Sequence, residues 1–241
     1  MVARIPTLRA SGRDYNRSCL HASTSRFRSL KKGEVVTSGP GFDLEYEAMP
    51  LSLDPGRTAL LLLDYQHDNI TATPGIAEAR VLEHSARVLE AARRRGLHVI
   101  HITASVRRDY LDMPRASSLW KTLREGKTLI QGTAGAEIHP LVAPRPNELV
   151  INKTCVDPFL TTNLGQALIN FDVNTLVLVG LWTNYVVEAT ARHAADVGYR
   201  VVIVRECCAS NDAENHEFAM TRILPTIADV SRLDDVLGAL A

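Results

Sequence analysis

The sequence has few cysteines, no long hydrophobic run and no excess of either charge. None of its four cysteines forms a C-x-x-C pair or stands beside histidines at zinc-ligand spacing, so neither a disulfide framework nor a structural zinc site is predicted. The longest apolar runs, at 59–63 and 175–182, are far shorter than the roughly 20 residues that a membrane-spanning helix requires. These absences favour a reducing compartment, and we expect a cytoplasmic location.

The composition is that of an ordinary globular domain. Hydrophobic residues make up 46% of the 241 positions, and 27 basic residues balance 27 acidic ones. These values exclude a chain that is disordered throughout. A chain of this length buries roughly 70 to 75% of its unfolded surface, so its core needs no cross-link. We expect no nucleic-acid partner and no membrane partner.

The N-terminal segment departs from this balance. Residues 1–34 contain eight basic side chains and two acidic ones. Such a leader fits a nucleic-acid arm, a transit peptide or residues from an upstream start codon. Because it lacks a secretory hydrophobic segment and a clear amphipathic period, we favour a mobile or subunit-wrapping arm. Residues 1–50 are therefore interpreted as arm and linker, and residues 51–241 as the main domain.

From residue 58 onward, short aliphatic runs alternate with helical patterns, which predicts an α/β domain with a parallel sheet. The expected strands are 58–64, 98–103, 149–152, 175–179, 200–204 and 226–230. The expected helices are 76–95, 163–170, 184–197, 212–224 and 231–240. Residues 104–148 contain only a short helical candidate at 117–124, and we expect them to form an excursion over the sheet.

Polar residues at the ends of the expected strands are candidates for a site, because ligands of open parallel sheets bind at the carboxyl ends of the strands. Asp64 ends one apolar run, and Lys153 follows another. The turn at 180–186 leads into a helix whose free N–H groups could bind an oxyanion. Each feature alone also fits an ordinary role: a loop-capping Asp, a surface lysine, and a strand-to-helix turn capped by Asn184.

The combined pattern resembles the isochorismatase-like hydrolases, also called the cysteine hydrolase family. The resemblance spans about residues 57–230, and the following positions carry it in order: Asp64, Gln66, Asp68, Gly135, Glu137, His139, Pro140, Lys153, Phe159, Thr162, Leu164, Gly180, Thr183, Val186, Thr190, His193, Asp196 and Gly198. The resemblance implies a three-layer αβα fold with a six-stranded parallel sheet. It also implies a homo-oligomer with the active site near a subunit contact.

The resemblance further implies roles for individual residues. Asp64 would act as general acid or base, and Lys153 would stabilise charge and tune the carboxylate of Asp64. The backbone N–H groups of Trp182 and Val186 would form an oxyanion hole. A cis peptide bond is expected between Leu181 and Trp182.

Val186 departs from the family pattern, because most members have a nucleophilic cysteine at this position. A valine side chain cannot attack a carbonyl carbon, so the thioester route is closed there. Three explanations compete: a cysteine-independent hydrolase of the vinyl-ether type, an amidase or ureide hydrolase silenced by an engineered replacement of the cysteine, and a natural relative with another role. Amide or ureide cleavage of a small non-peptide metabolite is the leading hypothesis for the scaffold.

Aromatic residues near the turn indicate the size of the substrate. Trp182 and Tyr185 would narrow the pocket, and Phe159 would form another wall, although ordinary packing fits all three equally well. Cys207 and Cys208 are interpreted as buried structural thiols, and Cys155 as a packing residue that could share a face with Lys153.

No cofactor is expected. Nicotinamidase-like relatives place an Asp-x-His metal-ligand stretch after the second strand, where this sequence has 103–107 with neither residue. The glycines near Gly132 and Gly135 do not form the G-x-x-x-x-G-K-[ST] phosphate loop. The remaining partner is a small-molecule substrate.

Overall fold

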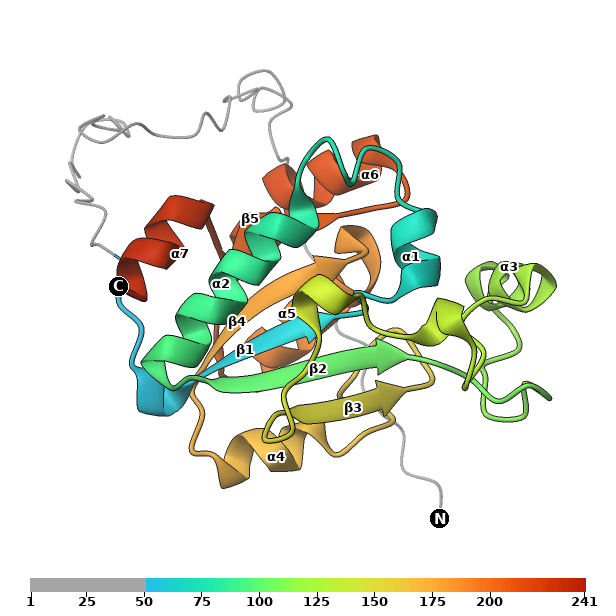
Figure 1. The fold of residues 1–241 in the computed structure, drawn as a ribbon, viewed down its shortest axis with the longest axis horizontal. Coiled ribbons are helices and arrows are strands. Elements are labelled where there is room, and N and C mark those ends of the chain that lie inside the picture. Colours follow the sequence, from blue (N-terminus) through green and yellow to red (C-terminus); the bar gives the residue numbers. More distant parts are fainter. Residues whose placement is uncertain (1–50) are drawn as a thin grey trace, which may run out of the picture. The chain divides into compact units, whose positions relative to one another are not determined.

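A six-stranded parallel sheet forms the centre of the molecule, in the order β3-β2-β1-β4-β5-β6 (Figure 1). The computed structural model describes residues 51–241, so the predicted arm and linker at 1–50 lie outside the described residues. The strands are β1 Thr58–Leu63, β2 His98–Ala104, β3 Leu149–Lys153, β4 Thr175–Leu181, β5 Arg200–Ala209 and β6 Asp229–Ser231.

Helices cover both faces of this sheet. α2 (Val81–Arg95) and α7 (Leu233–Ala239) pack on one face, and α4 (Leu164–Asn170) and α5 (Glu188–Asp196) pack on the other (Figure 1). The shorter helices are α1 (His67–Thr71), α3 (Ser118–Gly126) and α6 (Ala213–Phe218). The predicted three-layer αβα fold is confirmed.

The central strand β1 shows why the apolar runs predicted this architecture. All six of its residues are buried. Leu60 and Leu62 belong to the hydrophobic cluster under α2, whereas Leu61 and Leu63 belong to the cluster under α4 and α5. A strand covered on both faces needs apolar side chains at every position, so its sequence reads as a continuous run instead of an alternation.

Two strand boundaries differ from the prediction. β5 continues to Ala209 instead of ending at 204, because the register with β4 shifts after Leu178 and the later residues pair with Gly180 and Leu181. The last strand was predicted at 226–230, which is too early. A 3-10 turn occupies Leu224–Thr226, with Pro225 inside it, and the strand begins only at Asp229.

Helix boundaries differ where the chain takes left-handed or π-helical conformations. The helix predicted at 76–95 begins at Val81, because Gly75 (φ 71°) and Arg80 (φ 53°) are left-handed and interrupt any earlier turn. It ends before left-handed Gly96, as predicted. The helices predicted at 184–197 and 212–224 each contain a π-helical turn, at Thr183–Val187 and Ala219–Ile223.

The long connection from β2 to β3 lies differently from the prediction of an excursion over the sheet. Its helix α3 stands beyond the carboxyl end of β2 (Figure 1). Asp68 of α1 holds this connection, because its Oδ2 accepts a hydrogen bond of 2.7 Å from the backbone N–H of Leu129. Gly135 packs so closely on the carboxylate of Asp68 that a Cβ would collide with it. The connection is thereby fixed beside the ends of the strands.

Candidate active site

Asp64 and Lys153 form a buried ion pair at the carboxyl edge of the sheet. Lys153 Nζ lies 2.7 Å from Asp64 Oδ2. Only 5% of Asp64 and 2% of Lys153 is exposed to solvent. The interpretation of Lys153 as a surface lysine is therefore wrong, and the structure brings together two of the residues that the sequence singled out.

The backbone after β1 explains the position of the Asp64 carboxylate. Asp64 is left-handed (φ 57°), a conformation that aspartate tolerates better than most residues. Its backbone N–H donates to the carbonyl of Ile102, and its carbonyl accepts from the backbone N–H of Gln66 and from Asn69 Nδ2. These three hydrogen bonds fix the turn in which Asp64 leaves the strand.

The two carboxylate oxygens of Asp64 have different surroundings. Oδ2 accepts from Lys153, whereas Oδ1 is buried and has no hydrogen-bond partner among the described residues. Burial raises the pKa of Asp64 above its ordinary value of 3.8, although the Lys153 ammonium acts in the opposite direction. A carboxyl group with a raised pKa and a free oxygen can accept or donate a proton.

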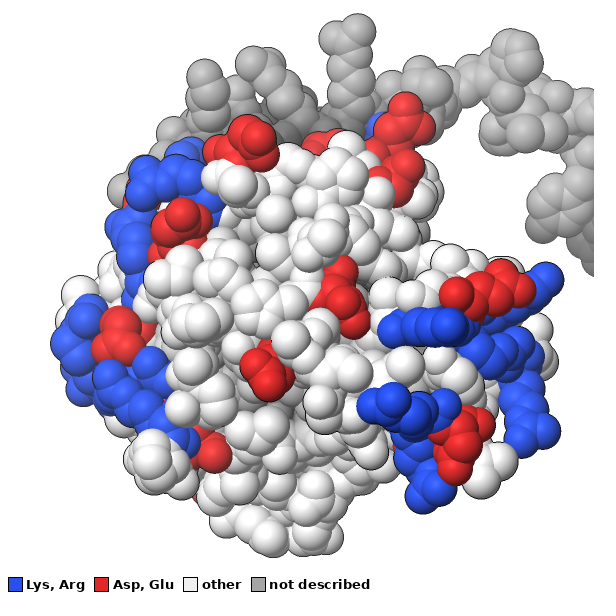
Figure 2. All heavy atoms as spheres, turned by 45° about the vertical axis from the view of Figure 1, so that its right-hand side comes forward, with Lys and Arg blue, Asp and Glu red and all other residues white. Residues whose placement is uncertain are grey.

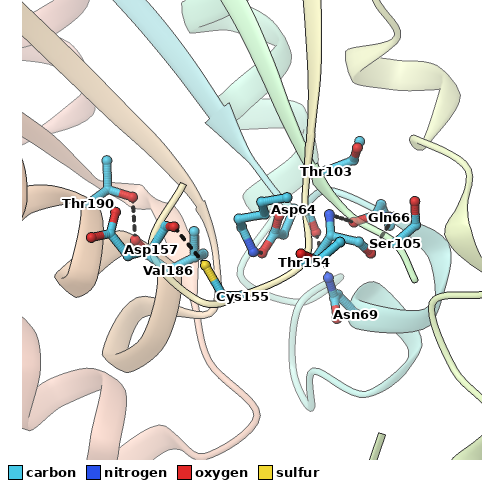
Figure 3. A network of polar contacts seen from close by, with 12 residues as sticks. Asp64, Gln66, Asn69, Thr103, Ser105, Thr154, Cys155, Asp157, Val186 and Thr190 are labelled. Carbon is cyan, nitrogen blue, oxygen red and sulfur yellow. Dashed lines mark hydrogen bonds and ion pairs between the residues drawn. The ribbon is translucent and has the colours of Figure 1, made fainter. Parts of the chain in front are cut away.

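Lys153 reaches this position because of the pleat of β3. Ile151 and Lys153 are buried while Asn152 between them is exposed, so the two buried side chains share one face of the strand. Asn152 joins the ends of β2 and β3, since its Oδ1 accepts from Thr103 Oγ1, Ser105 N and Ser105 Oγ at 2.7 to 3.1 Å. Thr103 and Ser105 are labelled in Figure 3.

The turn after β4 lies beside this pair. The expected cis peptide bond between Leu181 and Trp182 is present. Thr183 anchors the turn by hydrogen bonds to the carbonyl of Ala209 and to the ring of His216. The side chain of Asn184 contacts Ser210 Oγ and makes no helix-capping hydrogen bond, so the alternative of an Asn184 cap is wrong.

Gly180 allows β4 to approach β1 closely at this point. A Cβ on Gly180 would lie 2.5 Å from the carbonyl oxygen of Leu63. Val186 is 2% exposed, and its carbonyl accepts a hydrogen bond of 2.6 Å from Thr190 Oγ1, which Figure 3 draws. The chain therefore places the 182–186 turn next to the residue that precedes Asp64.

A small cavity of about 40 Å³ joins these elements. Asp64, Lys153, Trp182, Tyr185 and Val186 all line it. The rings of Trp182 and Tyr185 lie 5.9 Å apart between centroids, and Trp182 Nε1 donates to Thr73 Oγ1. The residues predicted for the catalytic, oxyanion and aromatic positions thus surround one space.

Phe159 is an exception, because it does not line this cavity. Its ring stacks on His193 at a centroid distance of 4.3 Å, and it packs against the core cluster under α4 and α5. His193 Nδ1 in turn contacts Asp157 Oδ2 at 2.7 Å. The alternative interpretation of Phe159 as ordinary packing fits the structure.

The three cysteines among residues 51–241 have the structural surroundings that the sequence predicted. Cys207 and Cys208 are buried, and burial raises the pKa of both thiols, that of Cys208 to about 12. The Cys155 thiol contacts the carbonyl of Asp157 and Thr161 Oγ1, and Cys155 packs near Trp120. Its hydrogen bond to the carbonyl of Asp157 is drawn in Figure 3.

Sequence reasoning assigned no structural role to Asn69 and Gln66, two residues near Asp64. Asn69 is buried, lines the cavity and holds the Asp64 carbonyl. Gln66 is fully buried and uses its side-chain amide to bind the backbone of Ala104 and Ala136. Gln66 and Asn69 follow Asp64 by two and five residues, and this closeness in sequence was the available signal. The wall formed by α3 had a weaker signal, the helical spacing of Leu119 and Leu123.

Two broader features of residues 51–241 bear on ligands. These residues contain no group of three His, Cys, Asp or Glu side chains placed to hold a metal ion. Within the same range, no helix is long and apolar enough to cross a membrane.

Comparison with known proteins identifies the family. The sequence model of the isochorismatase domain matches residues 58–235. The chain belongs to this family. It is therefore an isochorismatase-family hydrolase, as its resemblance implied.

Named relatives are amidohydrolases. Maleamate amidohydrolase of Pseudomonas putida is 27% identical over 190 residues, which cover 76% of this chain and 87% of the relative. Ureidoacrylate amidohydrolase of Rhizobium rhizogenes is 28% identical over 179 residues, covering 65% and 72% respectively. The crystal structure of N-carbamoylsarcosine amidase from Thermoplasma acidophilum superposes with a TM-score of 0.61 at 27% identity, covering 74% of this chain and 97% of that protein.

Proposed function

We propose that this isochorismatase-family hydrolase cleaves a C–N bond of a small non-peptide amide or ureide by direct attack of water. The observation that carries the proposal is the Asp64 carboxyl group, which has one oxygen on Lys153 and a second buried oxygen without a partner beside the cavity. The amidohydrolase relatives support the C–N bond, and Val186 removes the thiol that a covalent route requires.

In the proposed reaction, the ionised Asp64 accepts a proton from water as the water oxygen bonds to the carbonyl carbon. Asp64 then donates that proton to the nitrogen while the C–N bond breaks, so the products are an acid and ammonia or an amine. Lys153 keeps its proton and stabilises the charge on Asp64. The backbone N–H groups of Trp182 and Val186 are assigned to the developing oxyanion.

The decisive experiment compares the unchanged protein with Val186→Cys on a panel of small amides, ureides and vinyl ethers. We expect the unchanged protein to release ammonia without any covalent adduct in intact-protein mass spectrometry. Val186→Cys should react faster and show an acyl adduct. Ammonia release by the cysteine variant alone would overturn direct water attack and identify the unchanged chain as a silent amidase.

A second candidate function is acid-catalysed cleavage of a vinyl ether, and the raised pKa of Asp64 favours it. A protonated Asp64 would donate its proton to the vinyl carbon, and water would then add to the resulting cation. This function predicts carbonyl product from vinyl ethers, no ammonia from amides, and a rate that falls as pH rises through the pKa of Asp64. The same panel separates the two functions.

Two further expectations stay predictions: a homo-oligomeric assembly and a cytoplasmic location. A sedimentation measurement on the purified full chain tests the first, and fractionation of cells tests the second.

A further inference from the structure

The wall of the cavity that faces the ion pair is apolar. It is formed by Leu119, Trp120 and Leu123 of α3, by Leu129 after that helix, and by Val156 after β3. Leu119 and Leu123 lie four residues apart, so they occupy the same side of α3. Trp120 is buried against Val106 and Met113, which fixes the helix in place. This wall presents no hydrogen-bonding side chain to the cavity except the indole of Trp120.

Three hydrogen-bond donors among the lining residues, on Lys153, Asn69 and Trp182, already have protein partners, whereas Asp64 Oδ1 has none among the described residues. Within the described part of the chain, Lys153 is the one cationic residue that lines the cavity, and its Nζ lies 2.7 Å from Asp64 Oδ2. Asn69 donates to the carbonyl of Asp64, and Trp182 Nε1 donates to Thr73. Among residues 51–241, no arginine lines the cavity. A second charge on a bound molecule would therefore find no counter-ion apart from the pair assigned to the reaction.

The basic residues of the same connection lie on its outer side. Figure 2 shows Lys and Arg gathered on the lobe at the right of the view, the side that carries α3. The Lys121 side chain is 64% exposed and pairs with Glu125, and the Arg107 side chain is 56% exposed and pairs with Asp109. Arg107 and Lys121 are solvated and paired at the surface, so they add no positive charge to the interior of the cavity.

Charge and volume together restrict what can bind. Burying a carboxylate against leucine and tryptophan side chains without a partner is strongly unfavourable, whereas an uncharged alkyl or alkenyl group gains from the same contacts. The volume of about 40 Å³ holds roughly three water-sized groups. The space for a substituent between the ion pair and α3 is therefore small.

We propose that this site selects small uncharged amides or ureides whose substituent facing α3 is apolar, with Leu119 and Leu123 as the specificity-determining residues. The proposal rests on the hydrolase function proposed above. It distinguishes this chain from its named relatives, because maleamate and ureidoacrylate each carry a carboxylate.

The test uses matched ligand pairs in which an uncharged group replaces the carboxylate. The first pair is maleamate and cis-but-2-enamide, in which a methyl group replaces the carboxylate. The second is ureidoacrylate and its methyl ester. Binding to the full chain is measured by calorimetry and turnover by ammonia release. We expect the neutral member of each pair to bind at least tenfold more tightly. Equal or tighter binding of the carboxylates, or no binding of either neutral compound at millimolar concentration, would overturn the proposal.

Substitution of the wall residues Leu119 and Leu123 provides the second part of the test. Leu123→Arg should reverse the preference and strengthen maleamate binding at least tenfold, and Leu119→Arg on the same helix side should act in the same direction. Leu111→Arg is the matched control, because Leu111 belongs to the same connection but is 66% exposed. An equal gain in the control would show that general charge attraction, not the wall, determines selectivity.

Failure of this inference can be told apart from failure of the proposed function. Hydrolysis of both members of a pair at equal rates would refute the proposed selectivity but would support the proposed hydrolase function. Selective binding of the neutral member without any turnover would support the proposed selectivity but would refute the proposed hydrolase function. The unchanged protein supplies both results, so the test does not depend on the folding of any variant.

Discussion

Two carboxylates with little-exposed side chains, 6% for Glu148 and 7% for Asp64, lie at opposite strand ends of the sheet and have different surroundings. Glu148, just before β3, accepts hydrogen bonds from Arg93 Nε at 2.7 Å, Arg93 Nη2 at 2.8 Å, the Arg145 backbone N–H at 2.8 Å, and contacts His101 Nε2 at 3.1 Å. Asp64, just after β1, has one side-chain partner and one oxygen without any among the described residues.

The pKa values of the two groups move in opposite directions. Burial raises the pKa of Glu148, but the hydrogen bonds from Arg93, Arg145 and His101 outweigh it and hold the pKa at about 2. For Asp64, burial outweighs Lys153 and the pKa is raised. A fully satisfied carboxylate stabilises the fold, whereas a partly satisfied one beside a cavity retains the capacity for proton transfer.

The largest expected effect comes from Asp64→Asn. Removing the acid/base group should lower the rate of C–N hydrolysis by roughly 100-fold or more, since general acid–base catalysis contributes about 10²- to 10⁴-fold. Steady-state ammonia release measures the rate, and circular dichroism verifies that the variant is folded. Full activity of the variant would refute the assigned role.

Glu148→Gln should show the opposite profile. The substitution leaves the Arg93 guanidinium without its buried counter-charge, and we expect the free energy of unfolding to fall by about 2 kcal/mol. The Michaelis parameters should stay within a factor of two, because Glu148 does not line the cavity. Urea unfolding gives the first quantity. Activity lost without loss of stability would contradict the division between the two carboxylates.

A smaller effect is expected in the pH dependence of stability. The pKa of Glu148 in the folded protein, about 2, lies below its ordinary value of 4.5. Its contribution to the free energy of unfolding is therefore present above pH 4.5 and is lost as pH falls toward 2. Asp64 has a raised pKa, so its contribution has the opposite sign and is lost as pH rises through that pKa. The stability difference between the unchanged protein and Glu148→Gln should therefore shrink between pH 7 and pH 3 in urea titrations.

Much of the fold could be predicted, because strands that are buried on both faces have apolar residues at every position. The run at 59–63 is apolar at every position, and Gly96 ends α2 where the sequence indicates. Boundaries set by backbone conformation were harder. Arg80 is left-handed although arginine carries no signal for that conformation, and the extension of β5 depends on a register shift against β4.

The candidate site divides in the same way. Asp64 and Lys153 follow apolar strands, so their positions at the carboxyl edge could be predicted, and family resemblance marked the 182–186 turn. The position of the α3 wall could not be predicted from the sequence, because it is fixed by contacts between residues far apart in the chain, such as that of Asp68 with Leu129. Phe159 was predicted to form a wall of the substrate pocket, but its ring stacks on His193.

The position of α3 has a consequence for how such an enzyme can change. Asp64, Lys153 and the turn after β4 lie at the carboxyl ends of strands. The wall opposite them, apart from Val156, belongs to one connection of 44 residues between β2 and β3. Connections tolerate insertion and substitution far better than buried strands. Exchange of this single segment for that of another member could therefore give a new substrate range to an unaltered catalytic framework, and the same segment is the natural target for directed evolution.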